Sequence, residues 1–218
     1  MAMEQVLNQI RLSATVIPQT RDPEVVGALL ERLGSMEDLV SVTAASALLQ
    51  DAPVHDLRTL AVFIETYLEE ILVPVELPLI HKAFLHASHN ECRELIALDR
   101  SAADKMVMPQ FVNASRRVGH AHIQAMRPMR GERLVHRYLA AVESGEANGW
   151  HTIVYGITLA MFSLPARQGL MHYAYRTMGG FAHAAARSLP LSERQCLEIV
   201  EDLCDDLPQA IEATIAGN

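Results

Sequence analysis

Proline positions constrain the fold of this 218-residue chain more than any other feature of its sequence. Proline lacks a backbone N–H and is tolerated best at helix ends, so prolines between apolar-periodic runs mark helix boundaries. Apolar residues recur at helical spacing from Leu57 to Ile71, and from Leu159 to Thr177 across Pro165. The sequence therefore predicts an all-α fold, a single compact domain of about ten helices over residues 1–218. The prolines expected between helices are Pro53, Pro74, Pro109, Pro128, Pro165, Pro190 and Pro208.

Side chains typical of helix caps support these boundaries. Asp22 before a proline, and Gly34 after an apolar run, predict a helix over 23–33, and a second helix is expected over 36–50. Three pairs have the spacing of a capping box, namely Ser35 with Asp38, Ser88 with Glu91, and Ser192 with Gln195.

Two adjacent glycines, Gly179 and Gly180, interrupt a run that is otherwise helical. Each destabilises a helix by roughly 1 kcal/mol relative to alanine. We therefore expect the missing side chains to serve a close helix crossing or a local kink near a partner surface.

Composition excludes several classes of function. The chain is 50% hydrophobic but only 5% aromatic, which favours aliphatic helix packing over a β-sandwich. A formal net charge of −8 disfavours nucleic-acid and membrane-surface binding, because phosphates require clustered Lys and Arg. The longest apolar run, Gly156 to Leu164, is shorter than the roughly 20 residues that span a bilayer, and the first residues lack a signal-peptide pattern. Because Cys92, Cys196 and Cys204 are widely spaced, we expect buried thiols in a cytoplasmic protein.

Sequence motifs for catalysis and for metal binding are missing. No nucleophile elbow, phosphate-binding loop or dinucleotide fingerprint occurs, so no catalytic residue is predicted. The histidines form no His-x-x-x-His pair, and His120 and His122 would point about 200° apart on a helix. We therefore expect no metal ligands and no cofactor bound stably by this chain. A weak nickel site completed by another subunit stays open, since imidazole suits nickel.

Four short segments follow one another in the second half of the chain. They are Ala114–Gly119, Trp150–Gly156, Leu164–Pro165 and Ala184–Leu191. In type and order these segments closely resemble the urease accessory protein F (UreF) family. The resemblance covers residues 54–214 and is best between 114 and 192, whereas residues 1–53 are divergent and lack the glycines and the aromatic residue of the family's N-terminal segment.

The resemblance implies a function in assembly. Members of the UreF family are helical assembly factors, not enzymes, that join a scaffold accessory protein and a GTPase in loading nickel into urease. For this chain the resemblance implies the same two partners, together with the urease apoprotein and a second copy of the chain in a homodimer. Nickel would be handled by the complex.

The resemblance also implies which residues bind partners. They are Ser115, Arg116, Gly119, His151, Tyr155, Arg187, Pro190 and Gln195. Local structural roles compete with this interpretation: Arg116 can simply be exposed, Gly119 can permit packing, and His151 can bond a loop near a helix start. Arg187 in a last helical turn interacts favourably with the helix dipole, by roughly 0.3–1 kcal/mol. The family has a Gly-Gln turn after its Pro-Leu pair, and this chain keeps only the glutamine, Gln195.

Three alternative functions stay open at this point. A UreF-like paralogue could serve a metalloenzyme other than urease. An all-helical small-ligand-binding domain could line an apolar cavity with methionines such as Met126 and Met178, because methionine adapts to irregular pockets. A helical metalloenzyme would require several metal ligands within one chain. Neither of the last two explains the ordered series of C-terminal motifs.

Overall fold

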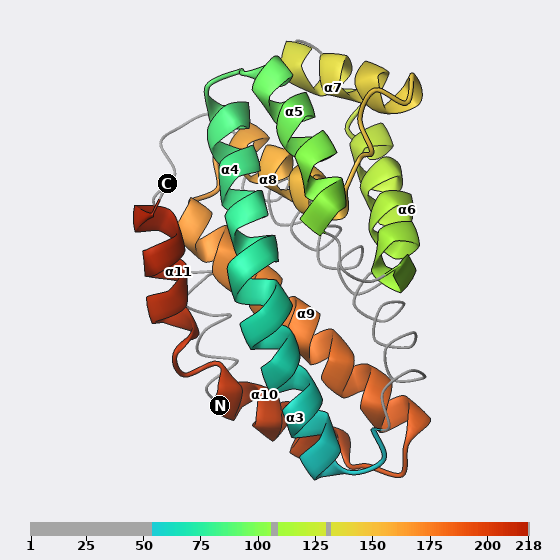
Figure 1. Ribbon diagram of the computed structural model, residues 1–218, viewed down its shortest axis with the longest axis vertical. Helices are drawn as coiled ribbons and strands as arrows, with labels where there is room; N and C mark the ends of the chain where they lie inside the picture. The colour runs from blue at the N-terminus through green and yellow to red at the C-terminus, as the bar shows by residue number, and fades with distance from the viewer. Residues whose placement is uncertain (1–53, 106–108, 130–131, 218) are drawn as a thin grey trace.

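The described part of the chain is entirely helical (Figure 1), as the sequence predicts. A computed structural model describes residues 54–105, 109–129 and 132–217. No strand occurs in these ranges. The elements are α3 (Leu57–Tyr67), the π-helix η1 (Leu68–Glu76), α4 (Leu77–Ser88), α5 (Cys92–Ala102), the 3₁₀ turn η2 (Ala103–Lys105), α6 (Pro109–Ala125), α7 (Arg133–Glu143), α8 (His151–Met161), α9 (Ala166–Ser188), α10 (Glu193–Leu203) and α11 (Leu207–Ala216).

The helices expected over 23–33 and 36–50 lie outside the described residues, as do the caps at Asp22 and Ser35 and the predicted boundary at Pro53. The single domain over residues 1–218 therefore stays a prediction.

Helix α8 forms the centre of the molecule. Its residues from His151 to Leu159 are all buried, which accords with an apolar sequence that has no polar face. Helices α4 and α6 both pack on α8, and α4 crosses it closely because Gly156 has no side chain. A Cβ atom at Gly156 would lie 2.5 Å from the carbonyl oxygen of Ile80.

Two clusters of buried apolar side chains share α4 and α8. The first cluster joins α3, η1, α9, α10 and α11, and it contains the predicted apolar positions Leu60, Ile64, Leu170, Tyr173 and Ala174. The second cluster joins α5, α6 and α7 and includes Trp150. Met126 and Met178 pack within these clusters. All three cysteines are free and buried, as expected.

One proline and one capping pair differ from the predictions. Pro74 was expected between helices, but it lies inside η1, so that α3, η1 and α4 form an uninterrupted rod (Figure 1). A π-helix has wider turns than an α-helix and accommodates a residue without an N–H more readily. Ser88 was expected to cap α5. Instead it ends α4, where its hydroxyl donates to the carbonyl of Phe84 at 2.7 Å.

Three other prolines and one other predicted cap lie at helix ends, as the sequence predicts. Pro109 begins α6, Pro165 is the N-cap of α9, and Pro208 lies in the first turn of α11. Ser192 is the N-cap of α10, but its side chain makes no capping hydrogen bond.

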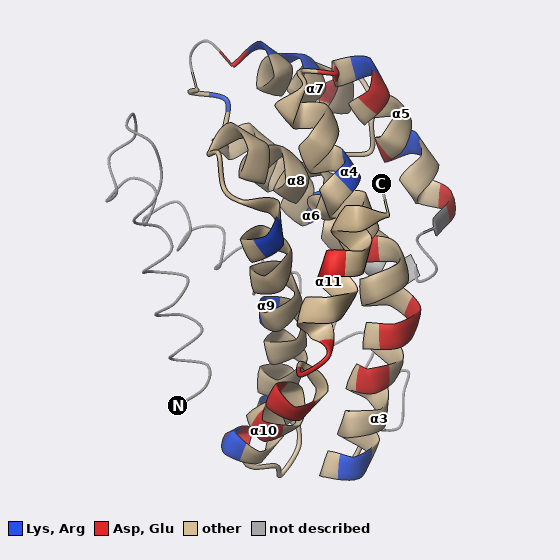
Figure 2. Cartoon of the chain, turned by 90° about the vertical axis from the view of Figure 1, so that its left-hand side faces the viewer, with Lys and Arg blue, Asp and Glu red and all other residues tan. Residues whose placement is uncertain are grey.

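Exposed charge is distributed unevenly over these helices. Figure 2 shows Asp and Glu positions in red along the rod that begins with α3 and at the α10–α11 end of the molecule. The exposed acids include Glu65 of α3, Glu69 of η1, and Asp202, Asp205 and Asp206. None of the described helices is long and apolar enough to cross a membrane.

Candidate partner-binding site

The contact between α6 and the start of α8 contains three of the eight predicted residues, Ser115, Gly119 and His151. The N-cap residue of α8, Trp150, makes no side-chain capping bond, and the backbone N–H of His151 donates instead to the Ser115 hydroxyl at 3.1 Å. A Cβ at Gly119 would lie 2.0 Å from the carbonyl oxygen of Gly149 and 2.8 Å from the His151 nitrogen. Ser115 therefore caps α8 from a neighbouring helix, and Gly119 allows the two backbones to touch.

Asp99 holds the other side of this contact, and sequence reasoning missed it. Its carboxylate accepts hydrogen bonds from the Tyr138 hydroxyl at 2.7 Å and from the backbone N–H groups of Asn148, Gly149 and Trp150. The Asp99 carbonyl also accepts from the Trp150 indole at 2.8 Å. Asp99 thus fixes the loop that leads into α8.

A signal for Asp99 was present in the sequence. Cys92, Leu95, Asp99 and Ala102 recur at spacings of three and four, and all four are buried on one face of α5. A carboxylate on the apolar stripe of a helix must find buried donors, so its position predicts an internal hydrogen-bonding role.

Two buried imidazoles lie side by side behind this contact. The rings of His122 and His151 have their centroids 6.4 Å apart, and both side chains are almost completely buried. The Thr158 hydroxyl donates to the Val154 carbonyl at 2.8 Å, so its 3.2 Å contact with His122 requires a proton on Nε2 of that ring. Nδ1 of His122 and both ring nitrogens of His151 have no hydrogen-bond partner among the described residues.

Burial keeps these histidines neutral. It lowers the pKa of His122 to about 4, and burial with a smaller contribution from His122 lowers the pKa of His151 to about 3. No group of three or more His, Cys, Asp or Glu side chains in the described ranges could hold a metal ion.

Tyr155 binds within the core. Its hydroxyl donates to the Gly169 carbonyl at 3.1 Å and lies 3.3 Å from Nδ1 of His172. Burial, with a smaller contribution from nearby Arg176, lowers the pKa of His172 to about 4. Tyr155 therefore joins α8 to α9 and has no surface to offer a partner in this conformation.

The remaining predicted residues are exposed and lie in two places. Arg116 projects from α6, and no ion pair joins it to a described carboxylate. Arg187, Pro190 and Gln195 lie where α9 turns into α10, and Figure 1 places this turn at the opposite end of the molecule from α7.

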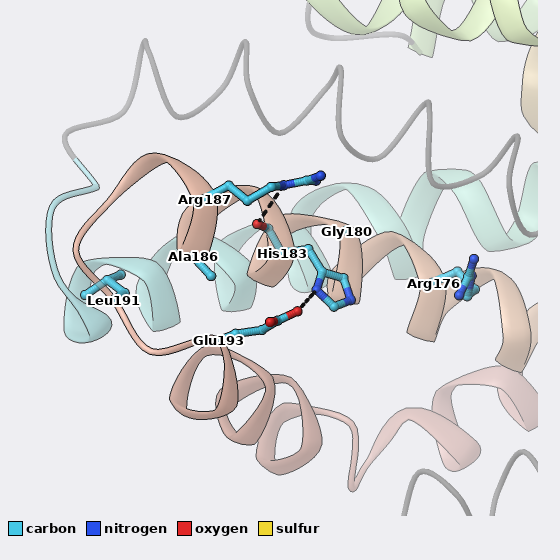
Figure 3. Close-up of a pocket in the computed structure, with 7 residues that line it drawn as sticks. All are labelled: Arg176, Gly180, His183, Ala186, Arg187, Leu191 and Glu193. Atoms are coloured by element: carbon cyan, nitrogen blue, oxygen red, sulfur yellow. Dashed lines mark hydrogen bonds and ion pairs between the residues drawn. The ribbon is translucent and has the colours of Figure 1, made fainter.

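Arg187 lines an open cleft of about 410 Å³ at this turn (Figure 3). Its Nε donates to the carbonyl of His183 at 3.3 Å. The His183 ring pairs with the Glu193 carboxylate at 2.8 Å, which links α9 to α10 across the cleft. The last turn of α9 thus carries a guanidinium group that reaches solvent, as the helix-dipole argument allows.

Comparison with known protein families identifies the fold. The UreF family model matches residues 54–204. The chain belongs to the UreF family. A search of curated proteins found no match.

Membership in the UreF family makes urease accessory function the general role of this chain. The matched UreF range begins just before α3 and ends just after α10, so it contains all eight predicted residues. Within it, four of these residues are buried and four are exposed. The buried ones are Ser115, Gly119, His151 and Tyr155, and the exposed ones are Arg116, Arg187, Pro190 and Gln195.

Proposed function

We propose that this chain is the assembly factor of a urease-activating complex. It would join a scaffold accessory protein to a GTPase, in the cytoplasm, while nickel is inserted into the urease apoprotein. The observation that supports this proposal is the UreF match over residues 54–204, because it covers every predicted binding residue. Nickel is cargo in this proposal, and the chain itself performs no catalysis and holds no cofactor.

The exposed and buried motif residues would divide the work of partner binding. Arg116 and Arg187 present guanidinium groups to solvent from two different helices, and arginine is enriched among residues that dominate binding energy. Ser115 and Gly119 lie directly beneath the exposed side of α6 and fix its position on α8. We therefore assign contact to the arginines and positioning of the surface to the buried residues.

Self-association belongs to the same proposal. A homodimer would double the number of partner sites, so that one complex could present two GTPases to one urease assembly. Sedimentation of the purified chain at several concentrations tests this point, and a monomer throughout would remove the homodimer from the proposal.

Co-expression with a urease gene cluster that lacks its own UreF protein tests the assembly function. We expect the wild-type chain to restore urease activity and nickel content, and to co-purify with the scaffold protein and the GTPase. Arg116→Ala and Arg187→Ala should each weaken capture of a partner by about 30-fold, which corresponds to about 2 kcal/mol.

Arg194→Ala is the matched control. Arg194 is exposed on α10, forms an ion pair with Glu198 on its own helix, and should bind partners as the wild type does. All three variants should melt at the wild-type temperature. Normal capture and normal nickel loading by both Arg116→Ala and Arg187→Ala would contradict the assignment of these residues, and failure of the wild-type chain to restore urease would contradict the proposed function.

A further inference from the structure

Glu76, the last residue of η1, carries a buried carboxyl group that ties three helical elements together. The Tyr67 hydroxyl from α3 donates to Oε2 of Glu76 at 2.7 Å. The Tyr173 hydroxyl from α9 donates to the same oxygen at 3.2 Å. Both phenols thus bind one oxygen, and the other oxygen, Oε1, is left for the proton of the neutral acid.

The surroundings of this carboxyl group offer it no opposite charge. Glu76 is only 6% exposed, and no described cation forms an ion pair with it. Burial raises the pKa of Glu76 to about 7, although the hydrogen bonds from Tyr67 and Tyr173 act in the opposite direction. The acid therefore changes its charge near neutral pH.

Other titratable groups on the neighbouring helices are directed elsewhere. Helices α4 and α11 also pack on η1. His81 of α4 interacts with the backbone of Thr214 on α11, and burial lowers its pKa. Glu212 of α11 forms an ion pair with Arg167 of α9. From α8, the rings of His151 and Tyr155 lie against the ring of Tyr173, at centroid distances of 5.9 Å and 5.2 Å.

The backbone at Glu76 is the irregular part of the α3–η1–α4 rod. The nine-residue π-helix contains Pro74, which has no N–H to donate. π-helical segments are rare and tend to occur where a helix must move or serve a site. Tertiary bonds such as those made by Glu76 must therefore hold this segment in place.

We propose that Glu76 is a proton-controlled latch: the neutral acid holds α3 and α9 to the π-helix, and ionisation favours a form in which α3 and η1 open to water. Within the described part of the chain, two phenols stabilise a charged carboxylate in this position, whereas in the open form water solvates it fully. Helix α3 also packs on α10, which carries Gln195, so the latch acts on the half of the molecule that contains the α9–α10 cleft.

The direction of the pH effect follows from the two protonation equilibria. The closed form titrates near pH 7 and the open form near the ordinary value of 4.5. The latch is therefore fully closed below pH 4.5, and the opening equilibrium rises about tenfold per pH unit until it levels off near pH 7. Over the interval from pH 5 to pH 7.5 we expect opening to increase about 100-fold.

Amide hydrogen exchange, corrected for the intrinsic pH dependence of exchange, measures this opening directly. In the wild type, protection of residues 60–76 should fall about 100-fold between pH 5 and pH 7.5. Amides of α7 should not follow this profile, since that helix lies in the other core cluster. In Glu76→Gln, the amide oxygen can still accept from both phenols but cannot ionise, so protection should stay high and flat.

Glu70→Gln is the matched control, because Glu70 lies exposed in the same π-helix, and it should behave as the wild type does. Carbon-13 detection of the Glu76 carboxyl in the wild-type chain gives a second measurement if the Gln variant does not fold. A titration midpoint below pH 5.5, or equal pH profiles for wild type and Glu76→Gln, would overturn the latch.

Discussion

Two buried carboxyl groups divide the molecule into regions that are held together differently. In the Asp99 region (α5, α7 and the loop 144–150), the carboxylate accepts from a phenol and from three backbone N–H groups. In the Glu76 region (α3, η1 and α9), two side-chain phenols are the donors to the carboxyl group among the described residues. The backbone N–H groups that bind Asp99 can change direction only if the loop 144–150 unfolds. The phenol side chains that bind Glu76 can rotate and keep their hydrogen bonds when a helix moves. The Asp99 region is therefore expected to be static, and the Glu76 region adjustable.

The largest expected effect that bears on this contrast is the change of the free energy of unfolding with pH. His122, His151 and His172 are neutral in the folded chain because burial lowers their pKa values to about 4, 3 and 4 from an ordinary 6.5. Their contribution to stability is present above pH 6.5 and is lost as the pH falls towards 4. Glu76 acts in the opposite direction over part of this range, since its pKa is raised.

On unfolding in this interval the three histidines take up about three protons, and Glu76 releases about one. The unfolded chain therefore binds about two more protons, and the free energy of unfolding should fall by about 5 kcal/mol between pH 6.5 and pH 4.5. Urea denaturation at several pH values measures this change. His151→Gln should reduce the slope. A flat profile over this interval would show that the three imidazoles take up protons in the folded chain, and would contradict the lowered pKa values.

Removal of the Asp99 carboxylate tests the static region. Asp99→Ala leaves the Tyr138 hydroxyl and the loop N–H groups without an acceptor in the core, which should lower the free energy of unfolding by about 4 kcal/mol. Chemical denaturation gives the value, and Asp104→Ala, on the exposed turn η2, should have no effect. A loss below about 1 kcal/mol would mean that water replaces the carboxylate, and the distinction between the two regions would weaken.

How much of this could be predicted from the sequence depends on the range of the interactions. The all-α class and the buried stripe around Leu170 follow from periodicity, which is local, and the UreF family follows from four ordered motifs. The latch could not be predicted, because Tyr173 lies 97 residues from Glu76 and spacing along the chain does not report that contact. The prediction that Pro74 lies between two helices was wrong for a related reason. Packing of η1 on α4 and α11 overrides the local tendency of proline to end a helix.

The candidate site shows the same limit. The motif residues Ser115 and Gly119 were identified, but their burial was not, because a motif does not state which side of a helix faces the core. Partner binding by Arg116, Arg187, Pro190 and Gln195 stays a prediction.

Gly119→Ala tests whether the α6–α8 contact is as rigid as the Asp99 region beside it. The added methyl group would lie 2.0 Å from a backbone carbonyl, so α6 and the loop must separate, and stability should fall by about 3 kcal/mol. Thermal melting and partner capture should be measured on the same sample. A variant that melts normally but no longer captures a partner would move Gly119 from the positioning residues to the contact surface.

Gly179→Ala is the smallest expected change and has the opposite sign. The sequence suggested that Gly179 serves a close helix crossing, but a Cβ there would meet no described atom within 4 Å, so this explanation fails for the described residues. Since Gly179 lies inside the continuous helix α9, alanine should raise the free energy of unfolding by about 1 kcal/mol. A thermal melt of the variant against the wild type is sufficient to measure it. If the variant is more stable and still captures its partners, the absence of a side chain at Gly179 serves neither packing nor partner binding. If it is stabilised but partner capture is lost, the open surface at Gly179 is where a partner approaches the adjustable region, and the two regions would differ in function as well as in rigidity.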